Sequence, residues 1–322
     1  MVLHIICGAG EPWREGVAGN GEAYSGGDGR MHVLFISDGD GKYGASQSMK
    51  QLIGGLLEYC GDIEISVVLP ARVRTAGYYR ELGCRTYRVM YEPFCQSIME
   101  EKWKMPFKFI IRGTEYLLGR CFGIFCLSRK MDMGAIDIIH SNSSREDFGA
   151  MLALKYNKPL IWHIREFGDK DFKCFSFRRN YIELMNESAW KFIAVSDIVH
   201  RHWIKKGLNS EKFSRVYDGV VTNTKKKVEY ARDKKIKFVM LGALRETKGQ
   251  YQVIQACRLM TKRERAKLSI DIIGGGTRAY TGKLNRMIKE LKLESVIHLL
   301  GYRNDMGSSL SRYDCGFMCS IS

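Results

Sequence analysis

Apolar and polar positions alternate along the chain with two different periods from Met31 onwards. Short apolar runs predict buried strands at 32–37, 64–69, 86–90, 136–140, 159–164 and 191–195. Between them, apolar residues at helical spacing predict helices over 46–59, 76–82, 107–127, 145–156, 176–188 and 197–206. Strands that alternate with helices in this way are typical of βαβ units, which build a parallel sheet covered by helices.

This alternation stops at a polar and charged stretch over 218–235, which predicts a linker. A second series follows, with strands expected at 236–242, 268–273, 296–300 and 313–319 and helices at 249–261 and 279–291. We therefore expect an α/β protein with two doubly wound, Rossmann-like domains, one over 31–217 and one over 236–322. In such folds ligands bind at the carboxyl ends of the strands, which we expect to line a cleft between two facing domains.

The first 30 residues differ from the rest, because they are rich in glycine and show no apolar periodicity. Their start, MVLHIICGAG, also lacks the basic residues that open a signal peptide. We expect residues 1–30 to be a disordered leader or a wrongly assigned start, with the fold beginning at Met31.

Composition narrows the class of protein. With 322 residues, 45% of them hydrophobic and 27% charged, the chain is long and apolar enough for two folded domains. Its ten cysteines are scattered without a C-x-x-C pair, and none has a neighbour at zinc-ligand spacing with a histidine behind it, so we expect no metal site and a reducing, cytoplasmic compartment. A net charge of +16 calls for an anionic partner. The lysine-rich runs lack interleaved aromatic residues, which argues against nucleic acid and favours anionic lipid or phosphorylated small molecules.

The most apolar helical stretch, 107–127, is interrupted by Lys108, Arg112, Glu115 and Arg120. It is therefore not a transmembrane segment, which needs about 18 or more nearly uninterrupted apolar residues. The four charges fall near one helical face. Two interpretations stay open: a helix whose apolar face is buried in the domain, and a basic amphipathic helix that rests on an anionic membrane surface.

A glycine loop follows the first predicted strand, where Gly39, Gly41 and Gly44 spell G-x-G-x-x-G. A dinucleotide site also needs an acid at the end of the second strand. That strand ends at Pro70 with Arg72 beyond it, so only an NADP-type oxidoreductase stays open as an alternative. A tight turn from strand to helix that binds no ligand is a further alternative. The loop otherwise supplies backbone N–H groups at a helix N-terminus, which suit any anion or sugar.

Two loops of the second domain carry the stronger signal. Arg245 and Lys248 follow its first predicted strand, and Gly249 opens the next helix. Two cations at a helix N-terminus make a site for a diphosphate. After the next strand, a run of glycines would let a nucleotide lie against the backbone: Gly274, Gly275 and Gly276.

In this order and spacing, the motifs resemble glycosyltransferase family 4, whose retaining enzymes have the two-domain GT-B fold. The more specific matches are LGALRETKGQ at 241–250 and PLIWHIREF at 159–167. The others are GASQSMKQLI, IIHSNSS, AVSDIVHRHWIKKG, VYDGVV in place of Tyr-Asn-Gly-Val, IIGGG, HLLGYRNDM and YDCGFMCSIS. The resemblance covers 31–322. It implies an enzyme of the hexosyltransferase type that takes a sugar from a nucleotide-sugar donor on the second domain. The acceptor, lipid-linked or polysaccharide, would bind the first domain, and no metal or other cofactor would be needed.

The resemblance also implies roles for single residues. Lys248 matches the phosphate-binding lysine of the family, and Arg245 is the expected substitute for an arginine that the family carries where this chain has Ala243. His163 and Glu166 fall where the family has a histidine facing the cleft and its neighbours, so we expect them to be the catalytic pair. A histidine that is merely hydrogen-bonded at the end of its strand is the alternative for His163.

On the sugar or acceptor side, the resemblance places the first loop and helix, with Gly41, Gly44 and Ala45, and the cation Arg165. For Arg165 two interpretations stay open, a solvated cation and one that binds the acceptor. We expect the enzyme in the cytoplasm, with attachment to the inner face of a membrane as one possibility.

A pair of glutamates that the family carries after the strand matching 313–319 does not occur before Ser322. The resemblance therefore predicts a fragment whose second domain is incomplete, and it leaves open whether this fragment transfers sugar. A non-catalytic module that binds sugar or lipid stays a further alternative.

Overall fold

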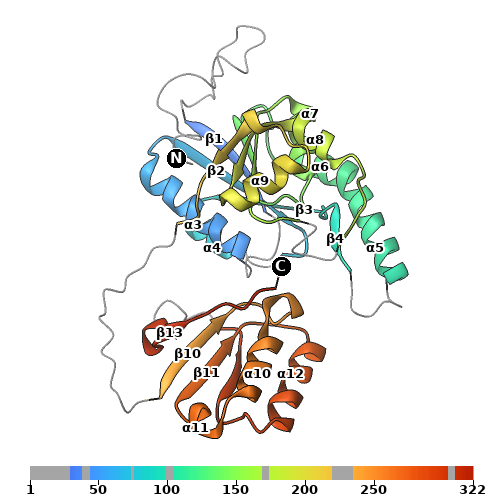
Figure 1. Cartoon of the computed structure of the whole chain (residues 1–322). Coiled ribbons are helices and arrows are strands. Elements are labelled where there is room, and N and C mark those ends of the chain that lie inside the picture. The colour runs from blue at the N-terminus through green and yellow to red at the C-terminus, as the bar shows by residue number, and fades with distance from the viewer. Residues whose placement is uncertain are drawn as a thin grey trace. The chain divides into compact units, whose positions relative to one another are not determined.

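The computed structural model of the chain describes residues 30–37, 44–73, 76–98, 105–168, 174–219, 235–303 and 309–321. The chain divides into two units, Met1–Val220 and Val221–Ser322, which we call the N-terminal and the C-terminal unit. Each unit contains a parallel sheet with helices packed against it (Figure 1). The leader expected at 1–30 lies outside the described residues apart from Arg30, and so does most of the expected linker.

In the N-terminal unit, the described residues form a sheet of seven parallel strands in the order β3-β2-β1-β5-β6-β8-β9. These strands are β1 (Met31–Ile36), β2 (Ile63–Pro70), β3 (Arg85–Val89), β5 (Ile138–Ser141), β6 (Leu160–Ile164), β8 (Ala189–Ala194) and β9 (Phe213–Arg215). All but the short β9 are expected from the sequence. The strand order runs outward in both directions from β1 and β5, so these two strands form the switch point at which doubly wound sheets bind ligands.

Helices connect the strands of this unit: α3 (Gly44–Tyr59), α4 (Gly77–Glu81), α5 (Met105–Leu118), α6 (Ile124–Ser128), α7 (Phe148–Tyr156), α8 (Tyr181–Ser188) and α9 (Asp197–Lys205). A π-helical turn, Gly119–Gly123, joins α5 to α6, and a 3₁₀ turn, Ser210–Lys212, precedes β9. The helix expected from residue 176 starts later, at Tyr181. The reason is that β7 (Cys174–Ser176) pairs antiparallel with β4 (Cys95–Ser97), which holds the start of that segment extended.

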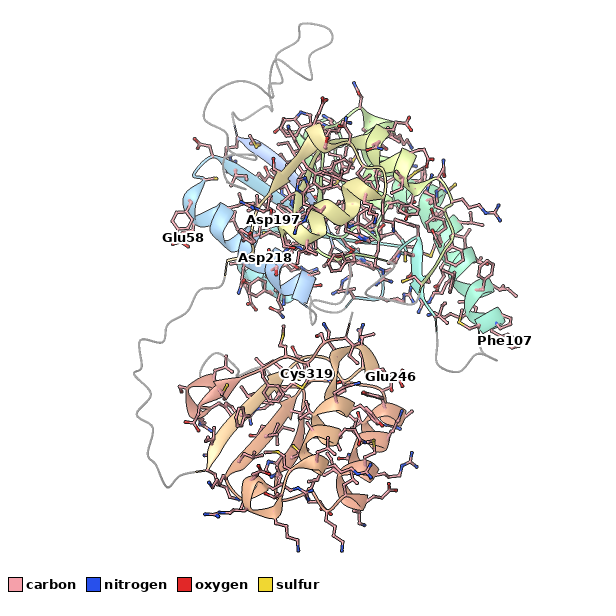
Figure 2. All side chains as sticks on the ribbon, in the orientation of Figure 1. Glu58, Phe107, Asp197, Asp218, Glu246 and Cys319 are labelled. Carbon is pink, nitrogen blue, oxygen red and sulfur yellow. The ribbon has the colours of Figure 1, made fainter. Side chains whose placement is uncertain are left out.

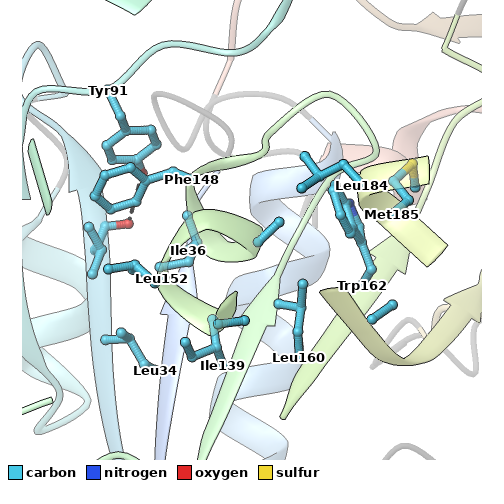
Figure 3. Close-up of a cluster of buried hydrophobic side chains, with 14 of the residues drawn as sticks. Leu34, Ile36, Tyr91, Ile139, Phe148, Leu152, Leu160, Trp162, Leu184 and Met185 are labelled. Atoms are coloured by element: carbon cyan, nitrogen blue, oxygen red, sulfur yellow. Dashed lines mark hydrogen bonds between the residues drawn. The ribbon is translucent and has the colours of Figure 1, made fainter. Parts of the chain in front are cut away.

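The seven-stranded sheet divides the core of the N-terminal unit into two halves. Successive residues of β1 point to opposite faces. Val33 and Phe35 meet the apolar side of α3, whereas Leu34 and Ile36 belong to the cluster that includes Trp162 and residues of α7 (Figure 3). All four β1 side chains have an exposed fraction of 0%. Strands covered on both faces are mostly apolar, and the few polar side chains within them, such as Ser66 in β2, His140 in β5 and His163 in β6, are no more than 2% exposed.

In the C-terminal unit, the described residues form a parallel sheet in the order β12-β11-β10-β13. Its strands are β10 (Ile236–Leu241), β11 (Leu268–Ile273), β12 (Ile297–Gly301) and β13 (Cys315–Gly316). Its helices are α10 (Gln250–Leu259), α11 (Lys262–Arg265) and α12 (Arg278–Glu290), with 3₁₀ turns at Glu246–Lys248 and Leu310–Arg312. Residues of α10 and α12 share one apolar cluster with Met240 and Ile272 of the sheet. The strand expected at 313–319 pairs only over two residues, Cys315 and Gly316.

Eight described cysteines are thiols, whereas Cys60 is disulfide-bonded, so the expectation of reduced cysteines does not extend to that residue. Within the described ranges, no helix combines the length and the apolar character needed to cross a bilayer.

The helical run from α5 to α6 packs closely on the segment that follows β3. A Cβ atom added at Gly119 would lie 2.8 Å from Tyr91 Cα, and one added at Gly123 would lie 2.2 Å from the carbonyl oxygen of Met90. Both positions therefore need glycine because backbone meets backbone there. This contact fixes how the run is rotated about its own axis.

We expect Gly123→Ala to destabilise the protein by about 1–3 kcal/mol, because the added methyl group overlaps the Met90 carbonyl and forces the backbone apart. The measurement is urea unfolding followed by circular dichroism. The matched control is Gly55→Ala in α3, where an added Cβ meets nothing within 4 Å. It should leave stability unchanged or raise it by up to ~1 kcal/mol, since alanine favours a helix interior over glycine. Equal effects of both changes would contradict the close contact.

Candidate functional site

Polar residues stand where three strands of the N-terminal unit end side by side. Ser37, Asn142 and Arg165 directly follow β1, β5 and β6. Asn142 ties this edge together, because its backbone N–H donates to the Ile36 carbonyl oxygen at 3.2 Å and its side-chain amide donates to the Ala45 carbonyl oxygen at 3.0 Å. The second bond holds the start of α3 against the edge.

Of the glycine loop, only Gly44 falls within the described residues, and Gly39 and Gly41 lie outside them. Gly44 is the first residue of α3, and an added Cβ atom there meets nothing within 4 Å. Packing therefore does not require a glycine at this position. The first turn of α3, with Gly44 and Ala45, leaves backbone N–H groups at the positive end of the helix dipole.

Arg165 is held at this edge by hydrogen bonds on each of its nitrogens. Its Nε donates to Asn142 Oδ1 at 2.8 Å, and its Nη1 lies 2.6 and 2.8 Å from the two carboxylate oxygens of Asp218. Its Nη2 lies 3.4 Å from His163 Nδ1. Only 5% of the Arg165 side chain is exposed. The guanidinium is therefore a fixed part of the edge, and its charge is balanced by Asp218.

Two buried histidines lie beneath this guanidinium. His163 Nδ1 lies 3.3 Å from His140 Nε2, and the centre of the His140 ring lies 4.5 Å from that of Phe35, with the two rings tilted by 36°. Burial, aided by the positive charge of Arg165, lowers the pKa of His140 to about 3 and lowers the pKa of His163 well below its ordinary range. Both imidazoles are therefore neutral near pH 7. His163 Nε2 and His140 Nδ1 have no hydrogen-bond partner among the described residues.

Glu166 braces the turn that follows β5. Its Oε1 accepts hydrogen bonds from the Ser143 hydroxyl at 2.6 Å, the Ser144 hydroxyl at 2.8 Å and the Ser144 N–H at 2.9 Å. Its backbone carbonyl accepts a bond from Trp203 Nε1 at 2.8 Å. Charge-assisted bonds of this kind are short and strong, so one carboxylate oxygen is committed to holding the turn in place.

In the C-terminal unit, the segment Lys248-Gly249-Gln250 shapes the loop after β10. Gly249 has a φ of 79°, a left-handed conformation that favours glycine, and a Cβ atom there would lie 1.8 Å from the Cys319 carbonyl oxygen. Gln250 is fully buried, and its side chain donates to the Ala243 carbonyl oxygen at 3.0 Å. With the loop held in this way, Arg245 and Lys248 are exposed just before α10 begins.

The glycine run after β11 lets the ends of three strands approach each other closely. A Cβ atom at Gly274 would lie 1.8 Å from the Gly242 carbonyl oxygen, and one at Gly276 would lie 2.6 Å from Leu244 Cβ. Gly274 N–H donates to the Gly301 carbonyl oxygen at 2.8 Å. At Gly275 and Gly276 the backbone is exposed to a ligand rather than covered by side chains of their own. Helix α12 starts beside them with Thr277 as its N-cap, accepting a bond from the Tyr280 N–H.

The structure thus brings the residues predicted from the sequence into two groups, one in each unit. The first holds Gly44, Ala45, His163, Arg165 and Glu166. The second holds Arg245, Lys248, Gly249, Gly274, Gly275 and Gly276. Sequence reasoning missed two residues that hold the first group together, Asn142 and Asp218. The signal for them lay in the motifs, since Asn142 is part of IIHSNSS and Asp218 stands where the family carries asparagine.

Two family models match the chain. The model described as Glycosyltransferase Family 4 matches residues 47–224, which is more than half of the chain, and the model described as Glycosyl transferases group 1 matches residues 221–322. A comparison with curated proteins finds no match.

Solved structures are similar in fold. The Anabaena protein HepE, in complex with UDP and glucose, is 17% identical with a TM-score of 0.67, over 91% of this chain and 75% of that one. TarM of S. aureus is 11% identical with a TM-score of 0.61, over 90% of this chain and 81% of that one. The lipopolysaccharide outer core galactosyltransferase WaaB is 14% identical with a TM-score of 0.58, over 90% of this chain and 74% of that one. Likeness at these identities shows the fold.

These findings confirm the predicted α/β fold of the GT-B type and the predicted class of enzyme. They favour no oxidoreductase, so the NADP-type alternative is set aside. Since the family model spans both the edge with Arg165 and the connection to the second unit, the chain belongs to glycosyltransferase family 4.

Proposed function

We propose that this glycosyltransferase moves a sugar from a nucleotide-sugar, with a UDP-sugar as the first donor to test, to a lipid-linked or polysaccharide acceptor with retention of configuration. HepE was solved with UDP and glucose, and WaaB is a lipopolysaccharide outer core galactosyltransferase, which supports both choices. The observation that carries the proposal is the backbone edge of the C-terminal unit with two exposed cations, Arg245 and Lys248, beside the start of α10.

The departing nucleoside diphosphate sets the main chemical demand of this reaction, because negative charge develops on it as the sugar leaves. Positioned cations and helix N-termini stabilise such charge without reorganising. Lys248 and Arg245 are proposed for this role, with Gly249 placing Lys248 in the turn before α10. Gly274, Gly275 and Gly276 would leave the backbone open to the nucleoside. With two side-chain cations in place, we propose that no metal is needed.

The acceptor is proposed to bind the edge of the N-terminal unit. His163 is neutral near pH 7 and is therefore unsuited to store a proton. Because its Nε2 is buried and has no partner among the described residues, a sugar hydroxyl could reach this atom only if the edge opens. Glu166, with Oε1 committed to Ser143 and Ser144, is proposed as a positioning residue for the turn 142–144. Arg165, Gly41, Gly44 and Ala45 are proposed to line this side.

We further propose the domain limits 31–217 and 236–322 and a site of action in the cytoplasm, at the inner face of a membrane. A lipid-linked acceptor would be held there. Eight of the nine described cysteines are thiols, as suits a reducing compartment, and the disulfide of Cys60 is the exception.

The function is tested by adding a UDP-sugar and a lipid extract to the protein and measuring UDP release with and without EDTA. Release that depends on the extract and persists in EDTA supports the proposal. Acceptor binding without any release of a nucleoside diphosphate would favour a non-catalytic binding module instead. Oxidation of NADPH, added in a parallel assay, would contradict the proposed sugar transfer and favour an oxidoreductase.

Lys248→Ala should weaken UDP or GDP binding by about 10- to 150-fold in calorimetry, because a hydrogen bond to a charged group contributes about 1.5–3 kcal/mol. The matched control is Lys289→Ala in the last turn of α12, which should bind as the unaltered protein does. Unchanged affinity of the Lys248 variant would remove this residue from the donor site.

The buried histidines predict a particular pH dependence of stability. An unfolded histidine titrates near pH 6.5. Because the pKa of His140 is lowered to about 3, only the unfolded chain gains this proton between these two values. Stability should therefore fall as the pH drops below about 6.5, by up to ~1.4 kcal/mol per pH unit for each such group. His140→Phe should remove one such contribution. Urea unfolding between about pH 4 and 6 compares the slopes of the two proteins, and parallel lines would contradict a neutral buried His140.

A further inference from the structure

The helical run α5–α6 presents its apolar side outwards. Figure 2 shows Phe107 at the outer end of α5, away from the sheet. Eight large apolar side chains of the run are half or more exposed, from 50% for Leu118 to 65% for Phe107. Phe109 packs against the rings of Phe175 and Phe177 of the domain. We call the other seven the outer face: Phe107, Ile110, Ile111, Leu117, Leu118, Phe122 and Phe125.

The charges of the run lie on the opposite side, against the domain. Arg112 Nη1 lies 3.2 Å from Glu92 and 3.0 Å from Glu115, and Arg72 pairs with the same two carboxylates. The Arg120 guanidinium lies 5.4 Å from the centre of the Tyr116 ring. A helix on the surface of a water-soluble domain normally has the reverse arrangement, with its charges outwards. The sequence left open a helix with a buried apolar face and a basic amphipathic helix on a membrane. Neither interpretation predicts that the charged side chains face the domain.

The same side is anchored by a buried polar group. The Tyr116 hydroxyl donates to Asp147 Oδ2 at 2.6 Å, and Arg178 Nε donates to the same oxygen at 3.0 Å. Tyr116 is 2% exposed. Together with the backbone contact at Gly119 and Gly123, this bond prevents the run from rotating to bury its outer face.

An apolar surface of this extent marks an interaction site. The surrounding charge identifies the kind of partner. Glu115 is the only acid between residues 105 and 130, and it is half-buried and paired. Just after α6, Arg129 is exposed with its guanidinium 5.4 Å from the centre of the Phe125 ring. Lys130 Nζ, by contrast, donates to the Arg88 carbonyl oxygen at 3.3 Å. The whole chain carries a net charge of +16. Apolar side chains that stand beside cations, with no exposed acid among them, match the boundary between acyl chains and anionic headgroups of a bilayer.

We propose that the outer face of α5–α6 inserts into the headgroup region of an anionic membrane, with the run lying in the membrane plane and Arg129, beside Phe125, near lipid phosphates. This inference rests on the proposed function in one respect only: a membrane is chosen as the partner because a lipid-linked acceptor would be held there. Insertion would attach the N-terminal unit to the surface through apolar contact, and the positive charge would add selectivity for anionic lipid.

The test is flotation of the full chain with vesicles of phosphatidylcholine alone and of phosphatidylcholine with about a third phosphatidylglycerol. We expect binding to be stronger on the anionic vesicles and to weaken with salt, because exposed charges are screened beyond about 8 Å at physiological ionic strength. The double variant Ile110→Ser, Leu117→Ser should bind at least tenfold more weakly, since each change removes an apolar side chain that would leave water.

The matched control is Ile198→Ser on α9, which is 60% exposed like Ile110 and Leu117 but lies outside the run. It should float as the unaltered protein does. Equal loss in the control and the double variant, or no vesicle binding by the unaltered protein, would overturn the proposal. So would a dimer that the double variant disperses while vesicles go unbound, because the outer face would then join two copies of this chain.

Affinity for UDP is measured on the same double variant and should be unchanged, because neither residue belongs to the groups at the strand ends. Loss of vesicle binding with intact UDP binding separates membrane attachment from donor binding. Intact vesicle binding with no UDP affinity in the unaltered protein would instead reject the proposed function and leave the membrane proposal standing.

Discussion

A parallel strand covered by helices on both faces has only its ends available for chemistry, and this constraint organises both units. The four residues of β1 at 33–36 are apolar and completely buried, and the polar Ser37 follows directly where the strand stops. Backbone N–H groups at the starts of α3, α10 and α12 and the side chains that follow each strand are consequently concentrated at the carboxyl edges. The two units reach this result differently. The N-terminal edge is filled by interlocking polar side chains, whereas glycines leave backbone exposed at the C-terminal edge.

Hydrogen bonds and an ion pair fix the positions of the polar side chains at the edge of the N-terminal unit. Asn142 holds α3, Glu166 holds the turn after β5, and Asp218 balances Arg165. Such networks are rigid once satisfied, and they are costly when a member is removed. The neutral histidines beneath them depend on this order, since a displaced Arg165 would change both the burial and the local charge that lower their pKa values.

Periodicity located nearly every element of the fold, because buried parallel strands are continuous apolar runs and the helices between them are amphipathic. It failed where long-range pairing decides the conformation. Nothing local to 174–176 or 213–215 demands a strand, and each becomes one by pairing with a distant partner. The site residues were found through motifs, but their contacts were not. A sequence shows that Arg165 follows a strand, and only the fold shows that Asp218, from the expected linker, reaches it. The rotation of α5–α6 was equally hidden, since a period fixes which residues share a face and not where that face points.

The two glycines that seat α5–α6 on the backbone of Met90 and Tyr91 also bear on how this surface can change over evolutionary time. Gly119 and Gly123 leave no space for any side chain, so almost every substitution there would be removed by selection. The outer face obeys a looser rule, because Ile110 or Leu117 touches little and can exchange with other apolar residues at small cost to folding. Among descendants of this chain, we then expect the buried glycines of the run to stay unchanged. The exposed residues of the outer face would change more often, but from one apolar residue to another.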